Sequence, residues 1–181
     1  MTEAGSNEKT TISVVYCKPG ERAETVEMEE KLETMQAMVG GLIQEFFPFH
    51  SETDPRYDDV ALICNDEGKL MQMKPSRAIF DEDGRVMDVI AGPFFICYAP
   101  IESETFLSLP EDLKEEMRKK FDMPEHYYRS DEGLMVLKYD PNDLKEEMRK
   151  KFDLPEHYYR SDEGLMVLKY DPSDLDREPA R

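Results

Sequence analysis

The side chains that could perform covalent or metal chemistry in this chain are few, and the His residues illustrate this. The chain has three His, and His126 and His157 are copies of each other within an internal repeat, which leaves His50 as the independent imidazole. A metal site could be built from His126 with the neighbouring Glu125. Adjacent residues of a strand point to opposite faces, however. We therefore predict no metal site.

The Cys residues point the same way. A Cys–His nucleophile pair needs a reactive thiol, but Cys17, Cys64 and Cys97 each lie in an apolar run. Their odd number and wide spacing are typical of small buried thiols in a reducing compartment. No Gly-rich phosphate loop follows a strand. We therefore predict a protein that is not an enzyme, with no cofactor and no catalytic residue.

Carboxylates are the abundant functional groups. The chain has 41 Asp and Glu against 23 Lys and Arg, a net charge of −18, and residues 1–111 hold 22 of the acidic and nine of the basic side chains. Phosphates would be repelled, so direct nucleic-acid binding is not expected, whereas basic protein surfaces would be attracted. The alternative is that the acidity only keeps the protein soluble. We predict that three clusters bind a partner: Glu29, Glu30 and Glu33; Asp58 and Asp59; and Asp81, Glu82 and Asp83.

Turn residues and hydrophobic periodicity predict the elements that carry these carboxylates. Strands are expected over Thr11–Cys17, 42–49 and 59–64, and residues 86–98 should form two strands or one bent strand. A helix is expected over Glu29–Val39 with Gly40 as its C-terminal cap. Residues 65–68 read as a hairpin turn and residues 75–80 as one short helical turn. The predicted class is α+β, a small mixed or antiparallel sheet with packed helices.

An internal duplication forms the C-terminal part. Residues 112–142 and 143–173 differ only at 123/154 and 142/173. Helical spacing of Leu113, Met117 and Phe121, a capping-box pattern that begins at Ser108, and a hairpin over 127–137 predict an α-β-β unit. The predicted domains are an acidic α+β domain (1–111), two copies of the α-β-β unit (112–142 and 143–173) and a tail (174–181).

The location follows from what the sequence lacks. Residues 1–10 are polar and contain no signal-peptide core, and no apolar stretch is long enough for a membrane span. We expect a cytoplasmic protein that does not contact a membrane.

Several motifs resemble a known family. The stretches Asp59–Gly68, Pro75–Phe80, Asp88–Gly92 and Phe94–Ile96 resemble an uncharacterised domain family that occurs on conjugative elements, plasmids and phages of gut anaerobes. The resemblance covers about residues 11–140, and the extra copy at 143–173 departs from it. The shared positions look structural, so the resemblance supplies no catalytic residue.

The chain also resembles small acidic anti-CRISPR proteins of such elements, which inhibit type II effector nucleases. That resemblance implies an inhibitor that binds a type II CRISPR nuclease with its guide RNA and interferes with binding or cleavage of target DNA, with DNA mimicry as a candidate mechanism. The alternative is a non-enzymatic accessory module of conjugative elements that binds another protein.

Overall fold

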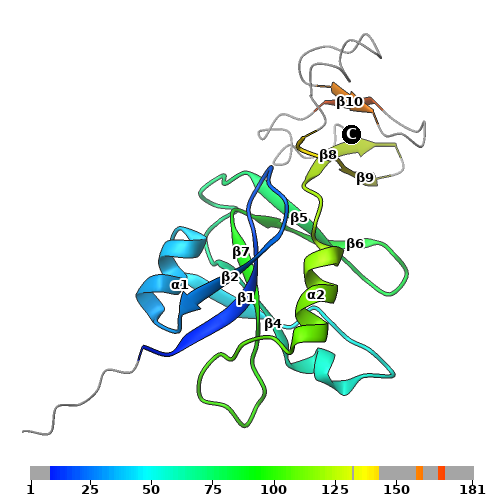
Figure 1. Ribbon diagram of the computed structural model, residues 1–181. Coiled ribbons are helices and arrows are strands. Elements are labelled where there is room, and N and C mark those ends of the chain that lie inside the picture. Colours follow the sequence, from blue (N-terminus) through cyan, green and yellow to red (C-terminus); the bar gives the residue numbers. More distant parts are fainter. Residues whose placement is uncertain (1–8, 132, 143–157, 161–166, 170–181) are drawn as a thin grey trace, which may run out of the picture.

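An antiparallel five-stranded sheet in the order β2-β1-β7-β4-β3 forms the centre of the protein (Figure 1). A computed structural model describes residues 9–131, 133–142, 158–160 and 167–169. The strands of the sheet are β1 (Thr11–Cys17), β2 (Glu24–Glu29), β3 (Ile43–Phe46), β4 (Val60–Asn65) and β7 (Phe94–Tyr98). All pairings within it are antiparallel.

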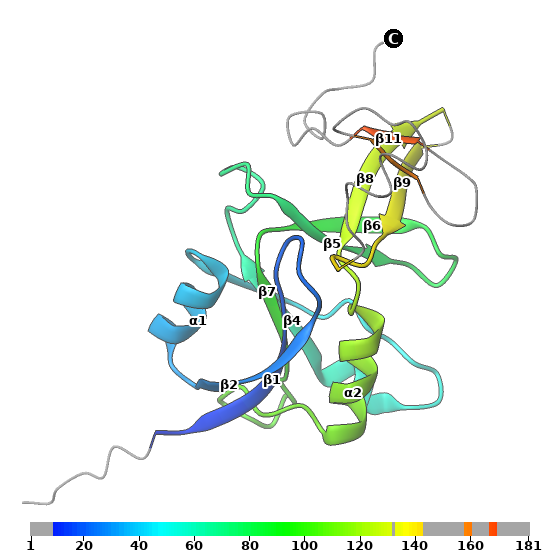
Figure 2. The same ribbon diagram turned by 45° about the horizontal axis from the view of Figure 1, so that its top comes forward.

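Both faces of this sheet are covered at its centre, which explains why β4 and β7 read as nearly continuous apolar runs. Helix α1 (Leu32–Val39) lies on one face, and helix α2 (Glu111–Lys120) lies on the other (Figure 2). The hairpin of β5 (Pro75–Phe80) and β6 (Val86–Ala91) also packs on the α2 face. Because neighbouring residues of a strand point to opposite faces, one strand supplies two separate cores: in β1, Val14 packs on the α1 face and Val15 on the α2 face.

The C-terminal part begins with the first copy of the repeat, which forms α2 and then the hairpin of β8 (Glu125–Ser130) and β9 (Gly133–Lys138). In the second copy, the described residues include the paired strands β10 (Tyr158–Arg160) and β11 (Val167–Lys169), whereas its predicted helix lies outside them. Leu113 and Met117 of α2 share a core with the central sheet. No helix in the described segments is long and apolar enough to cross a membrane. The domain boundaries stay a prediction.

The structure confirms the α+β class with antiparallel sheets, and strand is its predominant element. The strand predicted at Thr11–Cys17 is β1, and the strand predicted at 59–64 is β4 within one residue. Residues 86–98 form two strands, β6 and β7, and β3 occupies the middle of the strand predicted at 42–49.

The predicted helix over Glu29–Val39 is wrong at its start. Residues 24–29 form the edge strand β2, which pairs with β1 from Glu24 to Glu29, and the helix begins only at Leu32. Met28 of β2 is buried and packs in the core on the α1 face of the sheet. The predicted C-terminal cap is confirmed, since Gly40 has a φ of 79°, in the left-handed region.

Residues 75–80 form strand β5, not a helical turn, because each of Pro75–Ile79 is buried and the segment pairs with β6. Residues 65–68 do form a turn, in which the Asn65 side chain accepts the Glu67 N–H at 2.8 Å. This turn does not close a hairpin, since β4 pairs with β3 and β7 rather than with β5. A side chain at Gly68 would place its Cβ 2.5 Å from the Ala91 carbonyl oxygen, which explains the Gly in this turn.

The capping box predicted at Ser108 is also wrong. The Ser108 hydroxyl accepts the Ser13 N–H of β1 at 2.8 Å. The residue that precedes α2 is Pro110, whose side chain has no hydrogen-bond acceptor that could cap the helix. The Ser108 hydroxyl therefore bonds to the sheet and does not cap the helix, contrary to the capping-box pattern.

Candidate functional site

One carboxylate from each of two predicted acidic clusters, Asp58 and Glu82, acts on His50. Asp58 belongs to a 3-10 turn, η1 (Pro55–Asp59), and its Oδ1 lies 2.9 Å from His50 Nδ1. This hydrogen bond, and then the negative charges of Asp58, Glu82 and Glu52, raise the pKa of His50. Asp58 contacts His50 directly, whereas Glu82, from the loop between β5 and β6, acts on it only through its charge. The site is therefore an exposed group of carboxylates from separate segments with one titratable imidazole among them.

Within the β5–β6 loop, the three predicted carboxylates have different roles. Asp81 Oδ1 accepts the N–H groups of Asp83 and Arg85 at 3.0 and 2.8 Å, so this side chain holds the turn in place. Asp83 lies 3.8 Å from the Arg85 guanidinium, and both are exposed. Glu82 is exposed and has no ion pair within the described residues. Glu82 and Asp83 are therefore the carboxylates of this loop that a partner can reach.

Asp59 and its neighbours are partly engaged within the protein. Asp59 Oδ2 accepts the Tyr98 hydroxyl at 3.3 Å. The Arg56 guanidinium pairs at 2.7 Å with both Asp54 and Asp112, which lowers the pKa of each carboxylate. These contacts tie η1 to the start of α2 and leave Asp58 as its most accessible carboxylate.

The third cluster lies elsewhere. Glu29 ends β2, and Glu33 lies in the first turn of α1, the helix on the opposite side of the sheet from α2 (Figure 1). Ion pairs with Lys31 at 2.8 Å and Lys9 at 2.9 Å lower the pKa of Glu29 to about 2. Glu29 is therefore ionised, and its charge is balanced by two Lys side chains. Neither Glu30 nor Glu33 has an ion pair in the described part of the chain.

A buried Arg that the sequence did not single out joins several elements. The Arg77 side chain is fully buried in β5 and donates to the carbonyls of Phe121, Ser76 and Glu21 at 2.9, 3.0 and 2.6 Å. Nearby, the buried Glu125 accepts the Ala78 N–H and the Tyr127 hydroxyl, both at 2.6 Å. Burial raises the pKa of Glu125, against the effect of these hydrogen bonds. The sequence signal that could have revealed this buried Arg is its position, since Arg77 is the one charged residue of the segment Pro75–Phe80.

The thiols are all buried, as predicted. Burial raises the pKa of Cys17 to about 12 and of Cys64 to about 11, and it raises the pKa of Cys97 as well. All three are protonated at neutral pH. No cluster of three or more His, Cys, Asp or Glu with metal-binding geometry occurs among the described residues.

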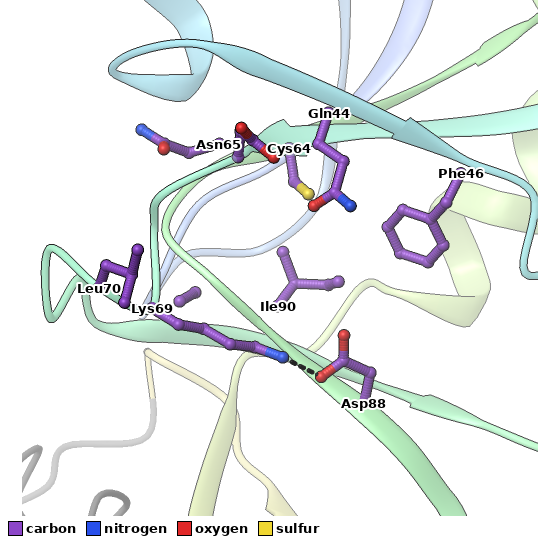
Figure 3. A pocket seen from close by; sticks show the side chains of 10 residues that line it. Gln44, Phe46, Cys64, Asn65, Lys69, Leu70, Asp88 and Ile90 are labelled. Carbon is purple, nitrogen blue, oxygen red and sulfur yellow. Dashed lines mark hydrogen bonds and ion pairs between the residues drawn. The ribbon is translucent and has the colours of Figure 1, made fainter.

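A pocket of about 300 Å³ lies beside edge strand β3, between that strand, the turn after β4, and β6 (Figure 3). Phe46, Cys64 and Ile90 supply apolar walls, and Gln44 points in from β3. The ion pair of Lys69 and Asp88 closes one side. Sequence reasoning missed this pocket, because its walls come from segments that become neighbours only through the order of the strands.

The comparisons with known proteins give one match. A protein family described as "Domain of unknown function (DUF3846)" matches residues 12–122. The matched region includes the central sheet, both helices and the His50 carboxylate group, and it ends just after α2. No curated protein and no solved structure matches the chain.

Proposed function

We propose, from the premise that the chain belongs to the DUF3846 family, that it is a non-enzymatic acidic inhibitor of a type II CRISPR nuclease. In this proposal a mobile element such as a conjugative element, plasmid or phage encodes it. It acts in the cytoplasm of a bacterial host, where it binds the nuclease with its guide RNA and interferes with binding or cleavage of target DNA.

The observation that carries the proposal is the exposed carboxylate group around His50. Asp58, Glu82 and Asp83 come from two segments far apart in the sequence, and their side chains remain accessible. The −18 net charge of the chain adds a long-range attraction to any basic surface.

An RNA-guided nuclease offers such a surface, because it holds nucleic acid in a positively charged channel and reads a short flanking motif with Arg side chains. Carboxylates pair strongly with Arg when the two groups are desolvated together. A folded protein that presents several of them would compete with DNA phosphates for the same cations.

The test is a DNA-cleavage assay in which a guide-loaded type II nuclease is titrated with the protein. Glu82→Gln/Asp83→Asn and Asp58→Asn should weaken inhibition, since loss of one partner of a desolvated charge pair costs about 2–5 kcal/mol. Asp81 is kept because it holds the loop turn. The control, Glu102→Gln/Glu104→Gln, removes equally exposed carboxylates from another loop.

Two results would contradict the proposal. Equal inhibition by all variants would show that the His50 carboxylates are only solvated surface charge, for which exposed pairs contribute about 0–1 kcal/mol. Absence of inhibition by the parent protein, together with tight binding to a different protein, would favour the accessory module of conjugative elements.

A further inference from the structure

The outer edge of β3 offers unpaired backbone groups beside the pocket of Figure 3. The Asp66 N–H donates to the Leu42 carbonyl at 2.8 Å, and β3 pairs with β4 in the same register. Antiparallel pairs alternate between bonded and non-bonded residues, so Gln44 and Phe46 bond to β4, whereas Ile43 and Glu45 turn their N–H and C=O groups away from it. No strand in the described part of the chain pairs with that edge.

The side chains of β3 add a second feature at the same edge. Gln44 and Phe46 lie on the face that lines the pocket, and Ile43 packs on the opposite face with α1. A strand that bonded to Ile43 and Glu45 would therefore point the side chain opposite Gln44 towards the pocket. This combination, main-chain bonds at an edge and a pocket for one side chain, is how several domains bind extended peptides.

The residues that line the pocket indicate which peptide side chain would fit it. Phe46, Cys64 and Ile90 form apolar walls that suit an aliphatic stem. Asp88 is half-exposed at the side of the pocket, and its Oδ1 accepts from Lys69 and from the Val89 N–H. Its other oxygen, Oδ2, accepts no hydrogen bond from the described residues. An Arg side chain has both the apolar stem and the forked cation for this carboxylate.

We propose that an extended, basic segment of a partner protein adds to the outer edge of β3 and places an Arg side chain in the pocket beside Asp88. The inference rests on the proposed function in one respect, that the partner is basic. A second copy of this chain is a poor occupant, because each molecule carries a charge of −18 and its β3 edge presents Glu45.

The experiment uses the full chain and a blocked seven-residue peptide of alternating Thr and Val with Arg at its centre. Binding is measured by fluorescence anisotropy, and amide hydrogen exchange is followed at Ile43 and Glu45. We expect slower exchange at both amides, and affinity at least tenfold weaker when the central Arg is replaced by Glu or when the peptide backbone is N-methylated at alternate positions, a loss of about 1.4 kcal/mol.

Variants of the protein separate the two features. Glu45→Pro removes an edge donor that β4 does not use, and Pro is tolerated at such a position, so it should abolish binding. Its matched control is Glu27→Pro on the opposite edge of the sheet, in β2, which should bind normally. Asp88→Asn should weaken Arg binding about tenfold, whereas Lys69→Gln should strengthen it severalfold, because Lys69 competes for Asp88.

Equal binding of the Arg and Glu peptides, insensitivity to N-methylation, or no binding at about 1 mM peptide would overturn the inference. A dimer of the protein that Glu45→Pro dissociates would overturn it in favour of self-pairing. If Glu45→Pro does not fold, the N-methylated peptide and the Asp88 and Lys69 variants still decide the outcome. Nuclease inhibition without peptide binding refutes this inference alone, and peptide binding without nuclease inhibition refutes the proposed function alone.

Discussion

Arg77 gives the sharpest test of how the fold is held together. Its guanidinium is fully buried and donates to three carbonyls at 3.0 Å or less, from β5, the loop before β2 and the end of α2. In Arg77→Met, an unbranched apolar side chain replaces the aliphatic stem of Arg77, but the guanidinium is lost and these acceptors lose its N–H donors. A buried group left unsatisfied costs about 1–3 kcal/mol.

The expected loss follows from the burial of the acceptors. Phe121 and Ser76 are buried, whereas Glu21 is exposed and its carbonyl remains in reach of water. Two buried carbonyls give a loss of roughly 3 kcal/mol, once the relief of not burying a charge is allowed for. For a chain of this size, that lowers the melting temperature by about 6–12 °C.

The assay is urea denaturation followed by circular dichroism, with Arg85→Met as the control. The Arg85 side chain is 79% exposed, so its replacement should change the free energy of unfolding by less than about 0.5 kcal/mol. A loss below about 1 kcal/mol for Arg77→Met, or equal effects of the two replacements, would refute the reasoning.

Three further predictions follow from the same structure. The pKa of His50 measured by NMR should lie above its ordinary value of about 6.5 and fall in Asp58→Asn, and an unshifted pKa would contradict the ion pair. Because the pKa of His50 is raised in the folded state, its contribution to stability is fully present below the pKa of the unfolded state and is lost as pH rises through the pKa of the folded state. Deletion of residues 143–173 joins Asn142 to Asp174 and should leave a folded protein that melts within a few degrees of the parent, because the buried residues that form the two described cores end at Phe121; an aggregated product would show that the second copy completes a core. Cys17 and Cys97 are fully buried and should react with a thiol reagent only at the rate of unfolding, so rapid labelling of the native protein would contradict their burial.

The apolar strands could be read from the sequence because burial on both faces leaves a plain signal. Residues 94–97 and 60–64 are apolar at every position and are buried almost completely. The weaker signals failed where tertiary contacts decided the outcome. The sequence predicts one short helical turn over residues 75–80, yet pairing with β6 and the carbonyls around Arg77 make the segment a buried strand.

The candidate site was predictable only in part. Composition pointed to the acidic clusters, but local sequence cannot tell an accessible carboxylate from one that holds a turn, as Asp81 does, or one paired twice, as Glu29 is. The combined effect of Asp58 and Glu82 on His50 depends on where the β5–β6 hairpin packs. The same applies to the pocket beside β3, which the strand order creates.

The most direct test of the central claim is the affinity of the full chain for a guide-loaded type II nuclease, measured at about 50 and 200 mM salt with and without target DNA. If the protein occupies the DNA channel through its carboxylates, binding should weaken steeply with salt, and target DNA and the protein should exclude each other. Binding that is insensitive to salt and unaffected by bound target DNA, or no binding at either salt concentration, would contradict it.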